Sequence, residues 1–189
     1  MTSASSHLAL QTGNAAAITG GVNGIGLASA LRFASLGMNV LIADRDADQL
    51  KLAEEAVQVT AKDGAKCIGQ ICDIIDAAQV EQLAALAKEN FGNVSVLMNN
   101  AGAGINPGKP WENVDGWKKL LNINLWGVIH GVQSFVLQSL ETNDFYILCP
   151  DNDVTRKIDE RRIQRNADDL IKNRPALFEV ARGLCRCLR

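Results

Sequence analysis

Short, uniformly apolar runs alternate along the chain with longer segments in which apolar residues recur every three or four positions. The apolar runs have the length of buried strands, and the longer segments have the spacing of amphipathic helices. The apolar runs predict strands at residues 15–18, 39–43, 66–72, 94–98 and 144–149. The longer segments predict helices at residues 24–36, 46–61, 77–90 and 111–140. Strands and helices are therefore expected to alternate over most of the chain.

The predicted strands lack the alternation of apolar and polar residues that marks a sheet with one solvated face. Strands that are apolar throughout are typical of parallel sheets covered by helices on both faces. The alternation of strands and helices predicts a doubly wound α/β fold of the Rossmann type. We expect a sheet of about five strands, in the order 3-2-1-4-5. The residues expected to face the sheet are Ile25, Ala28, Leu31 and Leu36 in the first helix, and Leu50, Ala53 and Val57 in the second.

Composition excludes several functional classes. The 189 residues include 19 Lys and Arg against 21 Asp and Glu, whereas a dedicated nucleic-acid-binding protein usually carries a basic excess. The apolar runs are too short to span a bilayer, and residues 1–8 lack the basic segment and apolar core of a secretory signal. Five cysteines and two histidines form no zinc-binding pattern, so we expect no metal site. Reduced, buried thiols in a cytoplasmic protein are the expected state.

The charge distribution divides the chain near Pro150. Residues 1–150 carry a net charge of −5 and residues 151–189 a net charge of +3. A basic segment of this kind either contacts an acidic partner or forms the solvated face of a helix, and the second is the commoner case. We therefore predict a single domain over residues 1–189, with an α/β core at 13–150 and a charged helical tail at 151–189.

The turn after the first predicted strand reads Thr-Gly-Gly-Val-Asn-Gly-Ile-Gly, residues 19–26, and opens the first helix. In such a turn Gly20 permits the tight reversal, Gly24 allows a diphosphate to approach the backbone, and Gly26 allows the helix to pack closely on the strand. The exposed amides and the helix N-terminus then attract the diphosphate of a dinucleotide. The alternative is a glycine-rich turn without a ligand, and the position between a strand and a helix favours the binding interpretation.

Acidic residues follow the second and third predicted strands. Asp44 stands 18 residues after Gly26, where a carboxylate accepts hydrogen bonds from both ribose hydroxyls and repels a 2′-phosphate. We therefore expect NAD rather than NADP, although the neighbouring Arg45 can pair with that phosphate and weaken the preference. Asp73 is placed to contact the adenine amino group. Alternatively, Asp44 and Asp46, and likewise Asp73, cap the helices that follow them.

Four motifs, in this order and spacing, resemble those of the short-chain dehydrogenase/reductase family. They are the glycine-rich turn at 19–26, Asp73, Asn-Asn-Ala-Gly at 99–102, and Asn124 within Asn-Ile-Asn-Leu-Trp-Gly at 122–127. The resemblance covers residues 13–135 and implies a bound nicotinamide dinucleotide, with Asn124 ordering a water beside a catalytic lysine. The cofactor-binding residues expected from these motifs and from the strand ends are Gly20, Val22, Asn23, Gly24, Ile25, Gly26, Asp44, Arg45, Asp73, Ile74, Asn100, Ala101, Gly102 and Ile123.

The chain departs from this family where the family carries out proton transfer. Family members use a Tyr-x-x-x-Lys pair, in which the lysine lowers the pKa of the tyrosine, and a serine on the preceding strand. Here the single tyrosine, Tyr146, is followed four positions later by Pro150, and no serine occurs after Ser139. The resemblance therefore implies that an internal segment is missing after Leu140. Tyr146 stands in the apolar run at 145–149, which predicts a core strand rather than a catalytic position. We expect weak NAD binding and little or no turnover, with Asn124 as the remnant of the catalytic group.

Two functions fit these observations. The first is that of a short-chain oxidoreductase acting on a small alcohol or ketone, with an intact cofactor-binding half and impaired or absent catalysis. The second is a non-catalytic module that binds NAD or pairs with another chain as a homo- or hetero-oligomer. Because family members commonly associate through the 111–140 region, Trp111, Trp117 and Trp126 are either interface residues or ordinary core residues. Neither function involves nucleic acid or a membrane.

Overall fold

The computed structural model describes residues 8–104 and 106–136 of the chain. The chain divides into two units, residues 1–146 and 147–189, and every described residue belongs to the first. The predicted strand at 144–149 and the predicted tail lie outside the described residues. The fifth strand and the domain limits therefore stay predictions.

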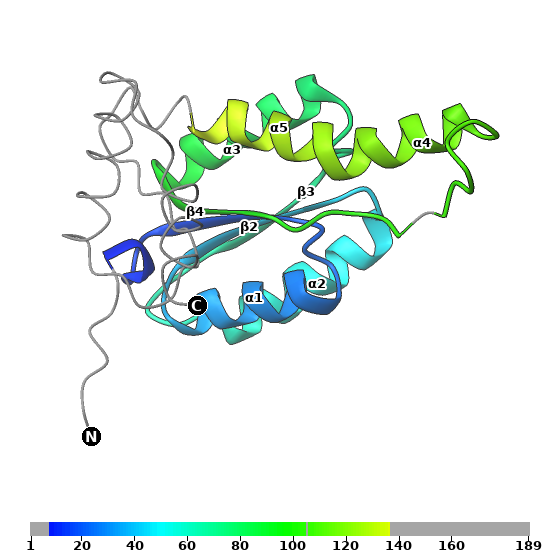
Figure 1. The fold of residues 1–189 in the computed structure, drawn as a ribbon. Coiled ribbons are helices and arrows are strands. Elements are labelled where there is room, and N and C mark those ends of the chain that lie inside the picture. Colours follow the sequence, from blue (N-terminus) through cyan, green and yellow to red (C-terminus); the bar gives the residue numbers. More distant parts are fainter. Residues whose placement is uncertain (1–7, 105, 137–189) are drawn as a thin grey trace, which may run out of the picture. The chain divides into compact units, whose positions relative to one another are not determined.

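Four parallel strands form a sheet in the order β3-β2-β1-β4 (Figure 1). The strands are β1 (Ala15–Thr19), β2 (Asn39–Asp44), β3 (Cys67–Ile71) and β4 (Val94–Asn99). Thr19 of β1 pairs in register with Ala43 on one side and with Asn99 on the other. The carboxyl ends of neighbouring strands thus meet at one edge, which is where ligands bind in open α/β sheets. The predicted order is confirmed for these four strands.

Helices cover both faces of the sheet, as the uniformly apolar strands predict. One face carries α1 (Gly24–Ser35) and α2 (Ala47–Thr60), and the other carries α3 (Ala77–Phe91) and a long helical run (Figure 1). The run consists of α4 (Val114–Leu121), the π-helical turn η2 (Asn122–Trp126), α5 (Gly127–Gly131) and the π-helical turn η3 (Val132–Val136). A short 3-10 turn, η1 (Leu8–Leu10), precedes β1. Within the described part of the chain, no helix combines the length and apolarity needed to cross a membrane.

Alternate residues of the central strands enter two separate hydrophobic clusters. The cluster on the α3 side contains Ala17, Leu41, Ala43, Val80, Leu83, Ala87 and Phe135. The cluster on the side of α1 and α2 contains Ile18, Val40, Ile42, Ala30, Ala34, Leu50, Ala53 and Val57. The face predicted for the second helix is therefore confirmed. The two clusters fix both faces of the central strands, and with them the edge at which the strand ends meet.

The face predicted for α1 is wrong at Ile25 and Ala28, which are exposed, although Leu31 packs against the cluster on this side. The helix buries its small residues, Gly26, Ala30 and Ala34, whereas Ile25 is 73% exposed and Leu31 is only half-buried. At its first turn α1 lies so close to the preceding turn that only a residue without a side chain fits there. A helix held this close presents small residues to the sheet, and its larger apolar residues pack at the flanks.

Two cysteines lie in or beside β3, and both are buried free thiols. Burial raises the pKa of Cys67 to about 12 from its ordinary value of 9.0, and the nearby Glu54 carboxylate adds to this effect. Burial also raises the pKa of Cys72 to about 11, with additional contributions from Asp73 and Asp76. Since the thiolate is the reactive form of cysteine, both residues are expected to resist alkylation in the folded protein.

The free energy of unfolding is expected to fall at alkaline pH because of these thiols. Between pH 9 and 12 the Cys67 thiol loses its proton in the unfolded chain and keeps it in the folded chain. Stability from this group is therefore fully present below pH 9 and declines as the pH rises, by up to about 1.4 kcal/mol per pH unit. Urea unfolding of the wild type and of Cys67→Ala from pH 8 to pH 11 measures the difference in slope. Equal slopes for the two proteins would contradict the prediction.

Candidate functional site

The turn between β1 and α1 is held by β2 and by its own glycines. The backbone amides of Gly20 and Gly21 donate to the carbonyl oxygen of Ala43 at 2.7 and 3.3 Å. Gly20 has φ +66°, a left-handed conformation that favours glycine. A Cβ atom on Gly26 would overlap the carbonyl oxygen of Gly20 and stand 2.6 Å from Nδ2 of Asn100. The tight reversal at Gly20 and the close packing at Gly26 thus agree with the prediction.

Asn100 ties the end of β4 to this turn. Its Nδ2 donates to the carbonyl oxygens of Thr19 at 3.0 Å and of Gly20 at 2.9 Å. In addition, the backbone amides of Asn100 and Ala101 both donate to Oγ1 of Thr19 at 3.1 Å. These four bonds fix the two strand ends relative to each other. The sequence indicates Asn100 as a residue beside the ribose, and the structure adds that it holds the turn together.

The N-terminus of α1 differs from those of the other long helices. Side chains of Asp46, Asp76 and Asn113 accept hydrogen bonds from first-turn amides of α2, α3 and α4. Asn23 precedes α1 without such a bond, and the first turn of α1 contains no acidic residue. Gly24 has φ +51° and no heavy atom within 4 Å of the place where a Cβ would lie. An uncapped helix start beside open space suits an anion such as a diphosphate.

Of the two acidic residues that the sequence offers as caps of α2, Asp46 takes this role and Asp44 does not. Asp46 is the N-cap of α2, since its Oδ1 accepts from the amide of Gln49 at 3.1 Å. Asp44 ends β2, and its Oδ1 accepts from the amide of Asp46 at 3.1 Å. Arg45, between them, is exposed. Asp44 therefore does not cap the helix, and it lines the same cavity as the β1–α1 turn.

Asp73 also is not a helix cap. Asp76 caps α3 and accepts hydrogen bonds from two of its first-turn amides, and a further bond from the side chain of Gln79 is the main cause of its lowered pKa. Asp73 instead accepts from the amide of Ile75 at 3.2 Å, and its own amide donates to Oε1 of Gln79 at 2.9 Å. These bonds shape the turn between β3 and α3, which presents Asp73 and Ile74 at the carboxyl edge of the sheet.

A cavity of about 350 Å³ lies at this edge and brings most of the predicted residues together. Its lining consists of Gly20, Val22, Asn23, Asp44, Arg45, Asp46, Asp73, Ile74, Asn100, Ala101, Gly102, Ala103 and Ile123. Asp46 and Ala103 are not among the predicted residues, and each is a direct chain neighbour of one that is. The predicted Gly24, Ile25 and Gly26 do not line the cavity. Gly26 instead determines the shape of the turn that forms one wall.

Asn124, in η2, is hydrogen-bonded to the loop that follows β4. Its Oδ1 accepts from the amide of Ala103 and its Nδ2 donates to the carbonyl oxygen of the same residue, both at 2.9 Å. The side chain does not line the cavity, whereas its neighbour Ile123 does. The water-ordering role of Asn124 stays a prediction. What the structure shows is that Asn124 fastens the Ala101–Ala103 wall of the cavity to the helical run.

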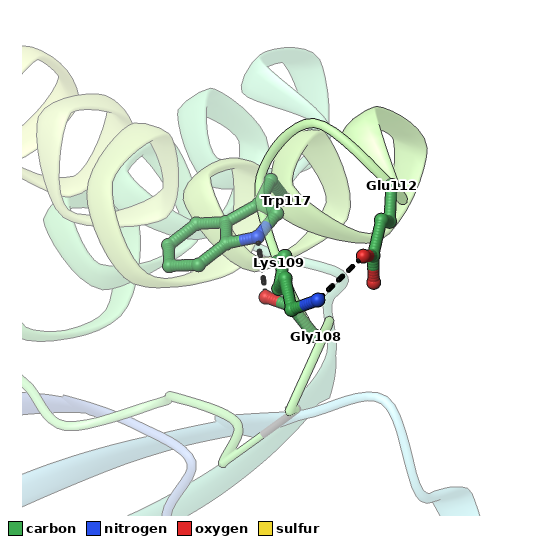
Figure 2. Close-up of polar contacts among 4 residues, drawn as sticks. All are labelled: Gly108, Lys109, Glu112 and Trp117. Atoms are coloured by element: carbon green, nitrogen blue, oxygen red, sulfur yellow. Dashed lines mark hydrogen bonds and ion pairs between the residues drawn. The ribbon is translucent and has the colours of Figure 1, made fainter.

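The loop leading from the cavity to α4 is fixed by Trp117 (Figure 2). The indole Nε1 of Trp117 donates to the carbonyl oxygen of Gly108 at 3.0 Å, and Lys109 pairs with Glu112 at 2.8 Å. Both members of the ion pair are exposed, so the pair contributes little to stability. Trp111 and Trp126 are 77% and 50% exposed. Neither is therefore an ordinary core residue. Trp117 is fixed by its hydrogen bond to the loop.

The comparisons with known proteins assign the family. Residues 14–144 match the family model described as short chain dehydrogenase. The chain is 37% identical over 134 residues to 1-deoxy-11-beta-hydroxypentalenate dehydrogenase from Streptomyces exfoliatus, an alignment that covers 70% of this chain and 47% of the relative. The parallel sheet with its helical crossovers is consistent with this family match. The chain belongs to the short-chain dehydrogenase family.

Solved structures of the same family resemble the chain in fold. A short-chain dehydrogenase/reductase from Burkholderia phymatum in complex with NAD has a TM-score of 0.66 and 37% identity, over 72% of this chain and 47% of that one. An NADPH-bound short-chain oxidoreductase from Pseudomonas aeruginosa PAO1, described as containing an atypical catalytic center, has a TM-score of 0.61 and 34% identity, over 68% and 50%. This chain therefore spans about half the length of the relatives it matches.

Proposed function

We propose that this chain is the nucleotide-binding part of an NAD-dependent short-chain oxidoreductase acting on an alcohol or ketone. The observation that carries the proposal is the cavity at the carboxyl edge of the sheet, which is lined by the turn leading into the uncapped helix α1 and by Asp44 and Asp73. When bound, the nicotinamide ring of the cofactor supplies the hydride chemistry of this family. The residues of this chain hold the rest of the dinucleotide and exclude water from it.

The proposed arrangement follows the chemistry of each wall. The amides at the start of α1 receive the diphosphate, because the helix N-terminus carries partial positive charge and no side chain competes for it. The carboxylate of Asp44 accepts hydrogen bonds from the two ribose hydroxyls. The carboxylate of Asp73 accepts a hydrogen bond from the adenine amino group. Ile74 and Ile123 supply apolar surface for the rings. Support for a dinucleotide also comes from the family, since solved neighbours are described as bound to NAD or NADPH.

The preference for NAD rests on the residues that a 2′-phosphate would meet. Asp44 and Asp46 both line this part of the cavity, and the exposed Arg45 is the basic residue that the lining contributes. The carboxylate of Asp44, which is proposed to contact the ribose hydroxyls, disfavours a doubly charged phosphate at the same place. We place this function in the cytoplasm, where the buried thiols Cys67 and Cys72 stay reduced.

Titration of the purified chain with NADH is expected to give saturable enhancement of nicotinamide fluorescence, with weaker binding of NADPH. An assay of alcohol oxidation and ketone reduction is expected to show no turnover above background. General acid–base catalysis contributes about 10²–10⁴-fold, and this sequence holds no tyrosine followed four residues later by lysine. Binding without turnover supports the proposal. Absence of binding contradicts the cofactor assignment, and turnover near 10 s⁻¹, roughly the typical enzyme value, contradicts the expected loss of catalysis.

Association with a second chain is a further candidate function, favoured by the outer surface of the helical run. Leu121, Leu125, Trp126 and Val132 are each between 43% and 50% exposed. Exposed apolar residues gathered on one element are typical of an interaction surface. Light scattering after size exclusion, with Leu125→Glu as the variant, tests this function. A wild-type chain that elutes as a monomer at high micromolar concentration argues against self-association.

A further inference from the structure

His130 of α5 contacts the β3–α3 turn from outside the cavity. Its Nδ1 lies 2.9 Å from the carbonyl oxygen of Ile74. Since a carbonyl oxygen only accepts, Nδ1 carries the hydrogen in this contact. Ile74 lines the cavity, whereas His130 does not. From outside the cavity, the imidazole therefore holds a residue that lines the proposed adenine side.

The packing around Ile74 makes this contact an effective constraint. A Cβ atom on Gly127, one turn before His130, would stand 2.9 Å from Cγ1 of Ile74, so α5 approaches this residue closely. Ile74 is 8% exposed and belongs to the cluster that contains Cys72 and Phe135. Its side chain is thus fixed by α5 and the core, and its backbone by His130. A displacement of either would move the cavity wall.

The neighbouring polar groups of the turn have partners within the turn or in α3. The amide of Ile75 donates to the carboxylate of Asp73, and the amide of Asp76 donates to the carbonyl oxygen of Asp73 at 3.0 Å. The Ile74 carbonyl oxygen differs, because its partner comes from a residue 56 positions away in sequence. The hydrogen bond from His130 is the link between this turn and α5, a segment that is otherwise only packed against it.

We propose that His130 is a positioning residue for the nucleotide cavity. Its Nδ1–H fixes the Asp73–Ile74 turn in the conformation that receives the adenine ring. Asn124 holds Ala103, another lining residue, so the helical run is fastened to the cavity lining at two places. This inference rests on the proposed function, because it assigns a purpose to the cavity wall.

Three substitutions at position 130 separate the hydrogen bond from bulk and polarity. In His130→Asn the side-chain Nδ2 is as many bonds from Cβ as Nδ1 of histidine, and it donates from nearly the same place. In His130→Gln the donor stands one bond further out, and His130→Leu has none. Gln133→Ala, at an exposed position three residues further along the same run, is the matched control. ADP-ribose is the probe, since it contains the adenosine side of the cofactor without the nicotinamide.

The Kd of ADP-ribose, measured by calorimetry at a temperature where circular dichroism shows each variant folded, is the first readout. We expect weakening of roughly five- to tenfold for His130→Leu and His130→Gln, binding within about twofold of wild type for His130→Asn, and no change for Gln133→Ala. Hydrogen exchange without ligand is the second readout. The amides of residues 72–76 are expected to exchange faster in His130→Leu and at the wild-type rate in His130→Asn.

The outcomes are distinguishable. A wild type that binds ADP-ribose and a His130→Leu variant that binds it equally well overturn the positioning role alone. So does a folded His130→Asn variant that binds no better than His130→Gln, and this comparison still decides if His130→Leu fails to fold. A wild type that binds no ADP-ribose overturns the proposed function, and the positioning role with it.

Discussion

Replacement of Gly26 with alanine is expected to lower the free energy of unfolding by about 1–3 kcal/mol and to weaken NADH binding at least roughly tenfold. The added methyl group would overlap the Gly20 carbonyl oxygen and stand 3.1 Å from the carbonyl carbon of the same residue. Asn100 would also have to move, although its Nδ2 holds both Thr19 and Gly20. The substitution therefore opens the β1–α1 turn, which forms one wall of the cavity.

Gly104→Ala is the control for this experiment. Gly104 has no heavy atom within 4 Å of its would-be Cβ, and its φ lies outside the left-handed region. Urea unfolding followed by circular dichroism and titration with NADH are measured on both variants. Gly104→Ala is expected to match the wild type in both. A Gly26→Ala protein with wild-type stability and affinity would show that the turn accommodates the methyl group, and would remove the geometric basis of the diphosphate site.

Replacement of Asp44 with asparagine is expected to change the choice of cofactor. A hydrogen bond to a charged group contributes about 1.5–3 kcal/mol, so loss of the carboxylate charge should weaken NADH binding by roughly one to two orders of magnitude. NADPH binding should improve, because the repulsion of the 2′-phosphate falls and Arg45 remains to pair with it. Asparagine keeps an oxygen that accepts from the Asp46 amide, so the turn itself is preserved.

Asp46→Asn provides the matched comparison for Asp44→Asn. It removes the same charge two residues away in the same cavity lining, and asparagine is an equally good N-cap for α2. Fluorescence titrations give the ratio of the dissociation constants for NADH and NADPH in each protein. Only Asp44→Asn is expected to shift this ratio by more than tenfold. Equal shifts in both variants would mean that general negative charge, rather than a contact made by Asp44, sets the preference.

The sequence predicts the strands and helices well because burial leaves a clear pattern. β2 is apolar at every buried position, and α2 carries Leu50, Ala53 and Val57 at helical spacing. The inner face of α1 could not be predicted in the same way. The close approach at Gly26 is a tertiary constraint, and it selects small residues that carry no hydrophobic signal. Periodicity of large side chains fails wherever a helix lies this close to its neighbour.

The candidate site likewise has features that the sequence predicts and features that it does not. Gly20, Asp44 and Asp73 stand at strand ends, so their convergence follows from the topology of a parallel sheet. Whether Asp44 or Asp46 caps α2 depends on one hydrogen bond, and the sequence admits both. The bonds from Asn124 to Ala103 and from His130 to Ile74 engage backbone atoms. Backbone partners leave no complementary residue in the sequence, so contacts of this kind are visible only in three dimensions.

The central position of β1 bears on how the protein is made in the cell. β1 pairs with β2, which follows it closely, and with β4. Asn100, directly after β4, bonds to Gly20 across a separation of 80 residues. At a ribosomal rate of about 5–20 residues per second, roughly 4–16 seconds pass between synthesis of Gly20 and synthesis of its partner. During that interval the edge of β1 that later pairs with β4 has no partner strand. Chaperones are therefore expected to bind the nascent chain mainly before β4 has been synthesised.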